Sequence, residues 1–234
     1  MMTFTALALT SVLFAADKPD FDKDTRPARR EAVGKSINGK SIAEMRDKVK
    51  ELWPTILFEK DGKKVEYVAT LDTDDGVLEI EFFPEKAPTH VRSFIALCKA
   101  GYFDGLVFHR CIPGFMAQGG CPLGNGTGGP GYALPAEFNN IKHEKGILSA
   151  ARTQDPDSAG SQFFLVHERA PHLDKKYTVY GKVVKGDDVI DKIVNRAERG
   201  NETPDKPAKI KKATVKVKGE ADSEKKADSE KKAP

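Results

Sequence analysis

The chain has 234 residues, of which 39% are hydrophobic and 31% are charged, and its 38 basic and 35 acidic side chains give a formal net charge of +3. This length and composition predict a globular domain with polar extensions. The nearly balanced charge argues against nucleic-acid binding, which needs a strongly basic face. The three cysteines form no CxxC pair and the five histidines do not cluster, so we predict no metal site and expect buried free thiols.

A long apolar run occupies residues 3–16. At about 14 residues it is shorter than the roughly 20 that a membrane-spanning helix needs, so we predict no membrane span. The run predicts a signal peptide over residues 1–16 and an exported, periplasmic or secreted protein. No Lys or Arg precedes it, however, and Phe14 interrupts the small-residue pattern before Ala16. A cytoplasmic protein whose apolar N-terminus is frayed, or forms a buried first strand, stays open as the alternative.

Residues 17–63 are predicted to form a polar arm followed by an amphipathic helix. The arm, residues 17–38, is polar and contains two prolines, which is typical of a linker or a disordered segment. Ser41 can cap a helix over residues 41–52, with Glu44 three residues later, and Pro54 ends it. Asp61-Gly62 then predicts a hairpin turn between residues 55–58 and 64–70.

From Val65 onwards the pattern changes to short strands separated by turns. Alternating residues predict strands over 65–73 and 77–83, and Pro88 begins a helix that Gly101 ends. Further strands are predicted over 106–111, 115–119, 146–151, 161–166, 178–184 and 208–218, with another helix over 187–196. About eight strands and two helices predict an all-β barrel or sandwich whose open ends the helices could cover.

Two low-complexity segments have simple interpretations. The glycine-rich loop over residues 123–131 lacks the Lys-Ser/Thr ending of a P-loop and opens no helix, so a tightly folded surface loop is the better interpretation. Residues 219–234 contain ADSEKK twice in tandem and few apolar side chains, which predicts a disordered charged tail.

The stretch from Phe108 to Gly120, FHRCIPGFMAQGG, combines one cation with several apolar side chains and one amide. A buried strand would not tolerate the lone guanidinium of Arg110, and a surface loop would not expose so many large apolar groups. An apolar wall that presents Arg110 and Gln118 is typical of a small binding site. On spacing alone, a salt-bridged structural arginine and plain core packing of the aromatic residues remain alternatives.

Four segments in order closely resemble the cyclophilins, the peptidyl-prolyl cis-trans isomerases: FHRCIPGFMAQGG, GNGTGGPGY, GILSAARTQDPDSAGSQFF and TVYGKV. The resemblance covers residues 64–218 and is closest to the short-loop bacterial type. It implies a closed eight-stranded antiparallel β-barrel with a helix over each end, and the helix near residue 41 is an addition to that fold. A barrel of this size is filled by side chains, so the ligand groove should lie on an outer face.

The resemblance also implies the site residues, and it implies no metal and no cofactor. Arg110, Phe115 and Gln118 match the catalytic positions. At the Arg152 position the family usually has asparagine and uses its backbone. The positions that match substrate-binding residues are Met116, Ala151, Arg152, Thr153, Gln162, Phe164, His172, Leu173 and Tyr177.

Two of these positions depart from the best-known eukaryotic members, which have tryptophan in place of His172 and histidine in place of Tyr177. Tyr177 keeps a ring and a polar tip, so isomerisation should survive. Cyclosporin uses that tryptophan, and we therefore expect it to bind weakly.

The implied activity is rotation of X-Pro bonds during protein folding, with proline-containing peptides and unfolded proteins as partners and a monomer as the expected state. The barrier of about 18–20 kcal/mol comes from amide resonance. In the twisted amide the proline nitrogen regains a lone pair, so a fixed guanidinium donor would stabilise that state. The alternative function is a proline-peptide-binding chaperone or scaffold module whose catalysis is incidental.

Overall fold

The computed structural model describes residues 19, 21, 34–198 and 200–219. The predicted signal peptide, most of the polar arm and the charged tail after Gly219 lie outside these residues. Within the described ranges, no helix is both long and apolar enough to cross a membrane.

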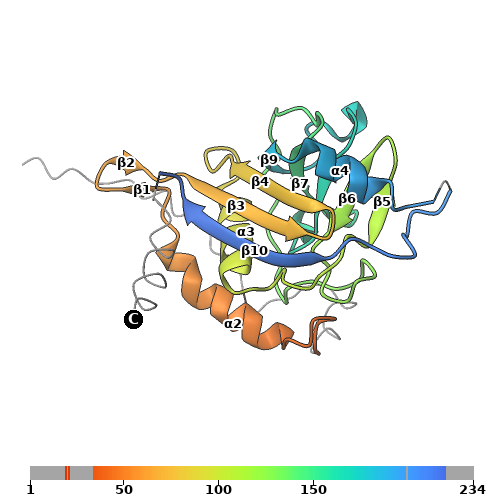
Figure 1. The fold of residues 1–234 in the computed structure, drawn as a ribbon. Coiled ribbons are helices and arrows are strands. Elements are labelled where there is room, and N and C mark those ends of the chain that lie inside the picture. The colour runs from red at the N-terminus through yellow and green to blue at the C-terminus, as the bar shows by residue number, and fades with distance from the viewer. Residues whose placement is uncertain (1–18, 20, 22–33, 199, 220–234) are drawn as a thin grey trace, which may run out of the picture.

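The main domain is built on one eight-stranded antiparallel sheet with the strand order β10-β3-β4-β9-β7-β8-β6-β5 (Figure 1). The sheet curls into a half-barrel, which confirms the predicted fold. Most predicted strands are present, but several are shorter than the sequence pattern implied. The strands are β3 (Tyr67–Thr73), β4 (Gly76–Phe82), β5 (Arg110–Ile112), β6 (Met116–Gly119), β7 (Ile147–Ala150), β8 (Phe163–Val166), β9 (Val179–Lys185) and β10 (Ile210–Val217).

The predicted closure of the barrel is overstated, because the edge strands β5 and β10 do not pair with each other. Instead, the segment before β5 makes separate backbone hydrogen bonds to the segment that enters β10. Gly105 N donates to Ile210 O at 2.7 Å, and Phe108 N donates to Ala208 O at 2.9 Å. The strand predicted over residues 106–111 therefore begins only at Arg110, since residues 106–109 form a single isolated bridge, Val107 to Lys209, rather than a ladder.

Two helices cover the sheet, as predicted. Helix α3 (Pro88–Lys99) packs on β10 and β9, and α4 (Asp187–Val194) packs on β4, β5 and β6. Helix α3 begins at Pro88, and its first N–H groups are satisfied from a distant loop: Glu137 accepts from Thr89 N at 2.9 Å and from His90 N at 3.0 Å. A carboxylate suits this position because the helix dipole is positive at its N-terminus.

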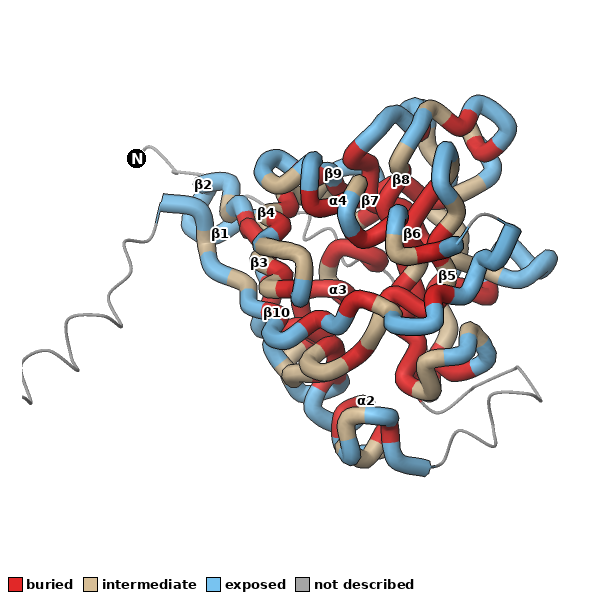
Figure 2. Tube along the Cα trace, turned by 45° about the vertical axis from the view of Figure 1, so that its right-hand side comes forward, coloured by how far each residue is buried: buried red, intermediate tan, exposed pale blue. Residues whose placement is uncertain are grey.

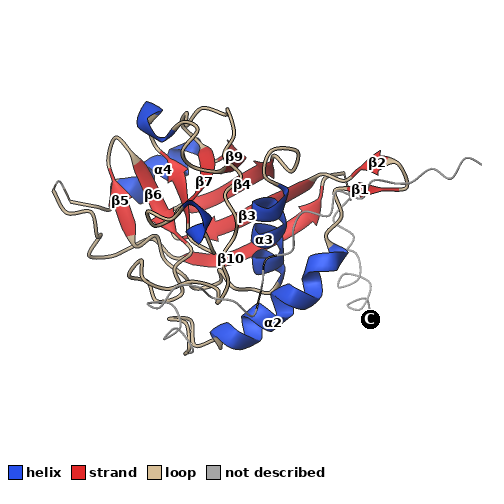
Figure 3. Ribbon diagram, turned by 180° about the vertical axis from the view of Figure 1, so that it is seen from behind, coloured by secondary structure: helices blue, strands red, loops and turns tan. Residues whose placement is uncertain are grey.

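Helix α2 (Ile42–Leu52) confirms the predicted amphipathic helix, with the Ser41 hydroxyl accepting from Glu44 N at 3.3 Å. Figure 3 shows α2 beside α3 on the outside of the sheet, and its buried face, Ile42, Met45 and Val49, joins the main core. The 3-10 turn η1 (Trp53–Thr55) and Ile56 continue this packing. Residues 42–56 are thus part of the folded body.

Part of the segment predicted as a linker is docked on this body. Phe21 is buried, with its ring 5.6 Å from that of Trp53 and 5.0 Å from that of Tyr132. Ile37 N donates to Pro122 O at 2.8 Å, and Asn38 Nδ2 donates to Asp104 O at 2.6 Å. The prediction of a free arm is therefore wrong for these residues, because their apolar and amide groups find partners that only the fold brings near.

The turn predicted at Asp61-Gly62 is present, and both residues have positive φ angles of 52° and 71°. It joins two short strands, β1 (Glu59–Lys60) and β2 (Lys63–Lys64), so the strand predicted from residue 64 is interrupted before β3. Figure 2 shows this hairpin as exposed, whereas the strands of the main sheet are largely buried.

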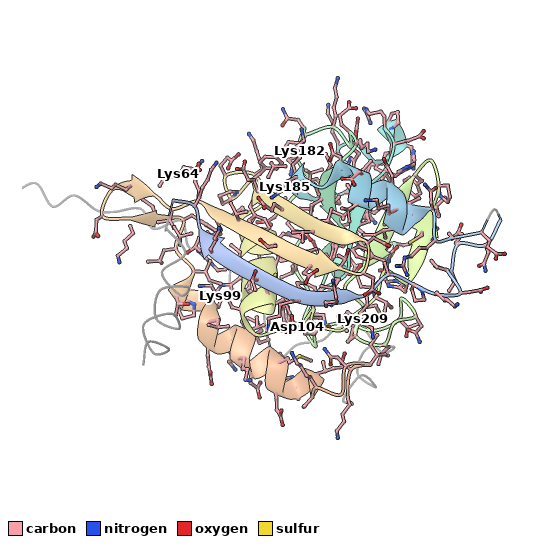
Figure 4. All side chains as sticks on the ribbon, viewed as in Figure 1. Lys64, Lys99, Asp104, Lys182, Lys185 and Lys209 are labelled. Atoms are coloured by element: carbon pink, nitrogen blue, oxygen red, sulfur yellow. The ribbon has the colours of Figure 1, made fainter. Side chains whose placement is uncertain are left out.

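The free edge of β10 is partly covered. Asp104, below β10 in Figure 4, accepts from Ala213 N at 2.9 Å and pairs with Lys212 at 2.8 Å. Charged side chains at an edge discourage pairing with other chains.

All three cysteines are buried and free, as expected. Burial raises the pKa of Cys111 to about 12, so its thiol is neutral at physiological pH.

Candidate active site

The outer face of the sheet brings the predicted site residues into two adjacent rows. Register places Arg110 opposite Gln118, Gln118 opposite Phe164, and Phe164 opposite Ser149. A second row runs from Ile112 through Met116 to Val166. Because side chains alternate between the two faces of a strand, the residues between these positions point the other way.

This alternation divides the apolar side chains into two clusters. Cys111, Ala117 and Leu165 belong to the main core inside the sheet. Met116, Phe164 and Leu173 belong to a second, smaller cluster on the outer face, where they are 2%, 5% and 7% exposed. Phe115, Ala151 and Tyr177 pack against it and are only partly buried. The predicted apolar positions are thus brought together in one patch.

Two aromatic pairs border the patch. The ring of Phe115 lies 5.4 Å from that of His172, which belongs to the turn η3 (Pro171–Leu173). On the other side, Phe164 meets Tyr177 edge-on at 6.0 Å. The two positions that depart from the eukaryotic pattern therefore lie against predicted groove residues.

Arg110 lies at the edge of this patch, with 41% of its side chain exposed. Its Nε donates to Glu202 Oε2 at 2.6 Å. Within the described part of the chain, Nη1 and Nη2 make no hydrogen bond. The ion pair was one alternative for Arg110, yet it occupies only one of the three guanidinium nitrogens. Sequence reasoning missed Glu202, which lies 92 positions away in a loop without any recognisable motif.

The two predicted amides are hydrogen-bonded to each other. Gln118 Nε2 donates to Gln162 Oε1 at 2.9 Å. Gln162 is 3% exposed, and its own Nε2 donates to Gly126 O at 2.7 Å and to Gly128 O at 2.8 Å. Gln162 therefore ties Gln118 to the glycine-rich loop, and Gln118 is the more exposed of the two.

The segment Ala151–Thr153 forms the far border. Ala151 N donates to Gln162 O at 3.0 Å. The guanidinium of Arg152 lies 4.5 Å from the ring centre of Tyr177 and 5.5 Å from that of Phe138, and it donates to Lys176 O. The Arg152 side chain is thus fixed in a stack, whereas the resemblance implied a role for its backbone.

Thr153 turns towards its own loop. Its Oγ1 and its backbone N both lie 2.8 Å from Ser158 Oγ. The structure places this side chain in a turn at the border of the patch.

A buried polar network lies beneath the patch and was not predicted. His143 Nδ1 lies 3.1 Å from Asp174 Oδ1, and Nε2 lies 3.1 Å from Ser149 Oγ. Burial lowers the pKa of His143, although the hydrogen bond to Asp174 acts in the opposite direction. This Ser-His-Asp arrangement is not a nucleophilic site, because Ser149 is fully buried and bonds to Thr178 O. Its effect is to support Phe164, whose ring stacks on His143 at 6.1 Å.

The described residues contain no candidate metal site, and they form a cavity away from the patch. Among the described residues, no group of three His, Cys, Asp or Glu side chains is arranged to hold a metal ion. A cavity of about 190 Å³ opens where the β1–β2 hairpin meets the sheet, between Phe58, Tyr67, Phe82 and Val91. It contains none of the predicted site residues.

Comparisons with known proteins agree with this geometry. The family model described as cyclophilin type peptidyl-prolyl cis-trans isomerase matches residues 68–215, more than half of the chain. A peptidyl-prolyl cis-trans isomerase of Synechococcus elongatus is 47% identical over 133 residues, which span 57% of this chain and 90% of the relative. Peptidyl-prolyl cis-trans isomerase B of Bacillus subtilis is 52% identical over 115 residues, which span 48% of this chain and 80% of the relative.

Solved structures lead to the same family. A cyclophilin type peptidyl-prolyl cis-trans isomerase of Cryptosporidium parvum superposes with a TM-score of 0.61 at 30% identity, covering 65% of this chain and 98% of that one. The same enzyme solved in the presence of the dipeptide Ala-Pro gives a TM-score of 0.60 at 31% identity, covering 64% and 98%. The chain therefore belongs to the cyclophilin family and is a peptidyl-prolyl cis-trans isomerase.

Proposed function

We propose that Arg110 accelerates isomerisation by donating a hydrogen bond to the proline nitrogen of the twisted amide. In a planar X-Pro amide this nitrogen has little lone-pair character, so the donor favours the transition state over both ground states. A guanidinium suits the role because it is always charged and holds its donors in a fixed fork.

The observation that carries this proposal is the position of Arg110 at the edge of an apolar patch that could hold a proline ring. Arg110 is one strand away from Gln118 and two from Phe164 in the same row, and Met116 lies in the adjacent row. Its two terminal nitrogens are unengaged among the described residues. The floor is apolar, so a donor beside it acts in a less polar medium than water.

Proline-containing peptides are the proposed ligands. The related Cryptosporidium enzyme was solved in the presence of Ala-Pro. In this chain Met116, Phe164 and Leu173 would receive the ring, with Phe115 and His172 on one side. Gln118 would orient the peptide backbone, since an amide supplies both a donor and an acceptor.

The test is an exchange measurement on a prolyl tetrapeptide with the wild type and with Arg110→Ala. Removing a donor aimed at developing charge lowers kcat by about 10² to 10³ in comparable sites. We expect a loss of that size with an unchanged melting temperature. If Arg110→Ala folds and keeps the wild-type rate, the arginine mechanism is wrong. If the variant unfolds, Arg110 is needed for the structure.

We also propose that the protein assists the folding of exported proteins. The apolar run over residues 3–16 supports this compartment, because it has the length of a signal-peptide core. Mass spectrometry of the mature protein should find an N-terminus near Asp17, and an intact Met1 would contradict export through a cleaved signal.

A further inference from the structure

The loop between α4 and β10 reaches the proposed catalytic arginine. It leaves α4 after Val194, passes beside β5 and enters β10 at Ile210 (Figure 1). Glu202 stands on this loop, and its carboxylate binds Arg110 Nε at 2.6 Å. Gln118, the cross-strand neighbour of Arg110, directs its amide N–H to Gln162 instead. Among the described residues, Glu202 is therefore the one side chain that fixes the guanidinium.

Glu202 is held in place by its own backbone as well as by the ion pair. Its carbonyl oxygen accepts from Cys111 N at 2.7 Å, so the residue is attached to the strand position next to Arg110. Pro204, two residues later, is buried. The backbone of Glu202 is therefore held beside β5, and its carboxylate has only a short distance to span to reach Arg110.

Other described residues of this loop are also hydrogen-bonded. Arg196 binds both carboxylate oxygens of Asp75, at 2.7 and 2.8 Å, and donates to Lys206 O at 3.0 Å. Bidentate pairs of this kind restrict orientation as well as distance. These contacts attach residues on both sides of Glu202, Arg196 before it and Lys206 after it, to one another and to the turn before β4.

We propose that Glu202 is a positioning residue for catalysis: it holds Arg110 through Nε and leaves Nη1 and Nη2 directed to the substrate. This inference rests on the proposed role of Arg110. A long arginine side chain has many rotamers, and a carboxylate that restricts them lowers the entropy lost when the transition state forms. The pair also reduces the net charge beside the apolar patch while the remaining N–H donors stay available.

The first test compares kcat and KM of the full-length wild type with Glu202→Ala and Glu202→Gln in a prolyl-peptide exchange assay. A half-exposed ion pair changes an equilibrium or rate constant by a factor of about five at most. We therefore expect Glu202→Ala to lower kcat by about threefold to fivefold and to leave KM nearly unchanged. Glu202→Gln keeps an acceptor without the charge and should lie between the two. A rise in kcat would mean that Glu202 restrains Arg110 from acting, and no change would mean that it does nothing; either result overturns the proposal.

Salt provides a readout that a purely structural role would not move. Both partners are partly exposed, at 41% and 56%, so added salt should screen the pair. The wild-type rate should fall towards that of Glu202→Gln as sodium chloride is raised, while Glu202→Ala stays insensitive. In an NMR spectrum, the Nε–H of Arg110 should exchange slowly in the wild type and quickly in Glu202→Ala. Equal salt profiles and equal exchange would contradict the positioning role.

A matched control is Glu79→Gln. Glu79 on β4 forms a similar exposed pair at 3.0 Å with Lys185 on β9, which Figure 4 labels. This variant removes a surface carboxylate that contacts no proposed site residue, and its rate should equal that of the wild type. A loss as large as that of Glu202→Ala would show that the effect is one of general surface charge.

A double-mutant cycle separates this inference from the proposed function. If Glu202 acts through Arg110, adding Glu202→Ala to Arg110→Ala should not lower the rate further. A further loss would overturn the positioning role and leave the arginine mechanism intact. If Arg110→Ala alone keeps the wild-type rate, the arginine mechanism itself fails.

Discussion

At the scale of single residues, the site combines expected side chains with partners that come from distant parts of the chain. Arg110, Gln118 and Gln162 were predicted, but neither the hydrogen bond between the two amides nor the contact of Arg110 with Glu202 was. Arg152 stacks on Tyr177, and the buried His143 lies beneath Phe164. The two members of each pair are also far apart in the sequence. Such contacts restrict the rotamers of residues in and around the patch, and restricted rotamers would lower the entropy cost of binding a peptide there.

His172 permits a test of ligand specificity at this scale. It packs against Phe115 where the best-known eukaryotic relatives have tryptophan. A tryptophan offers a larger apolar surface and an indole N–H, so His172→Trp should bind cyclosporin at least about tenfold more tightly than the wild type. Isothermal titration calorimetry measures both affinities. Equal affinities would mean that another position, such as Tyr177, limits binding.

His109 predicts a dependence of stability on pH. It is 6% exposed, and burial lowers its pKa to about 4 from an ordinary value near 6.5. A histidine that resists protonation when folded stabilises the protein fully above pH 6.5, and this contribution is lost as the pH falls towards 4. The shift corresponds to at most about 3 kcal/mol.

Urea denaturation at pH 7 and at pH 4.5 would measure this loss. His109→Leu should reduce the difference between the two pH values but not abolish it, because burial lowers the pKa of His143 too. A variant with the same pH dependence as the wild type would remove His109 from the explanation.

At the scale of elements, α2 and η1 extend the hydrophobic core beyond the part of the chain that matches the family model. That match begins at residue 68, whereas the buried residues Val49, Trp53 and Ile56 lie before it. A helix that contributes buried side chains to the main core should stabilise the domain as well as precede it.

Deletion of residues 1–63 tests the role of this element. Exposing the surface that α2 and η1 cover should lower the free energy of unfolding by about 3 kcal/mol or more, because several large side chains lose their partners. The isomerase rate of the molecules that remain folded should change little, since no proposed groove residue lies before Arg110. Deletion of residues 220–234 is the control and should alter neither property. If both deletion variants have the same free energy of unfolding, α2 and η1 do not stabilise the domain.

At the scale of the whole molecule, the apolar patch exists because two rows of side chains face outwards from a curled sheet. Strands β5, β6 and β8 contribute alternate residues to the core and to the patch, so a change of register by one residue would exchange the two sets. The missing ladder between β5 and β10 leaves Arg110 on an edge strand. That edge position is what allows the loop before β10 to reach it.

Much of the fold follows from local patterns in the sequence. Alternation predicted β3, β4 and β10, and capping residues predicted α2 and α3 close to their observed bounds. The four family segments predicted the curled eight-stranded sheet, and they contain most of the apolar residues that the structure gathers in the outer patch. Strand length was less predictable: residues 106–109 form an apolar run that resembles a strand, yet they make only one isolated bridge, from Val107 to Lys209.

The sequence by itself therefore determined the family and the order of the elements, and it predicted which apolar and basic residues share the outer face, because these depend on residue type and short spacing. Only the tertiary structure decided what holds those residues. Glu202 meets Arg110 across 92 positions, Glu137 satisfies the start of α3 across 48, and Phe21 is buried between Trp53 and Tyr132. Single carboxylates and rings in loops carry no periodic signal, so their partners become known only when folding brings distant segments together.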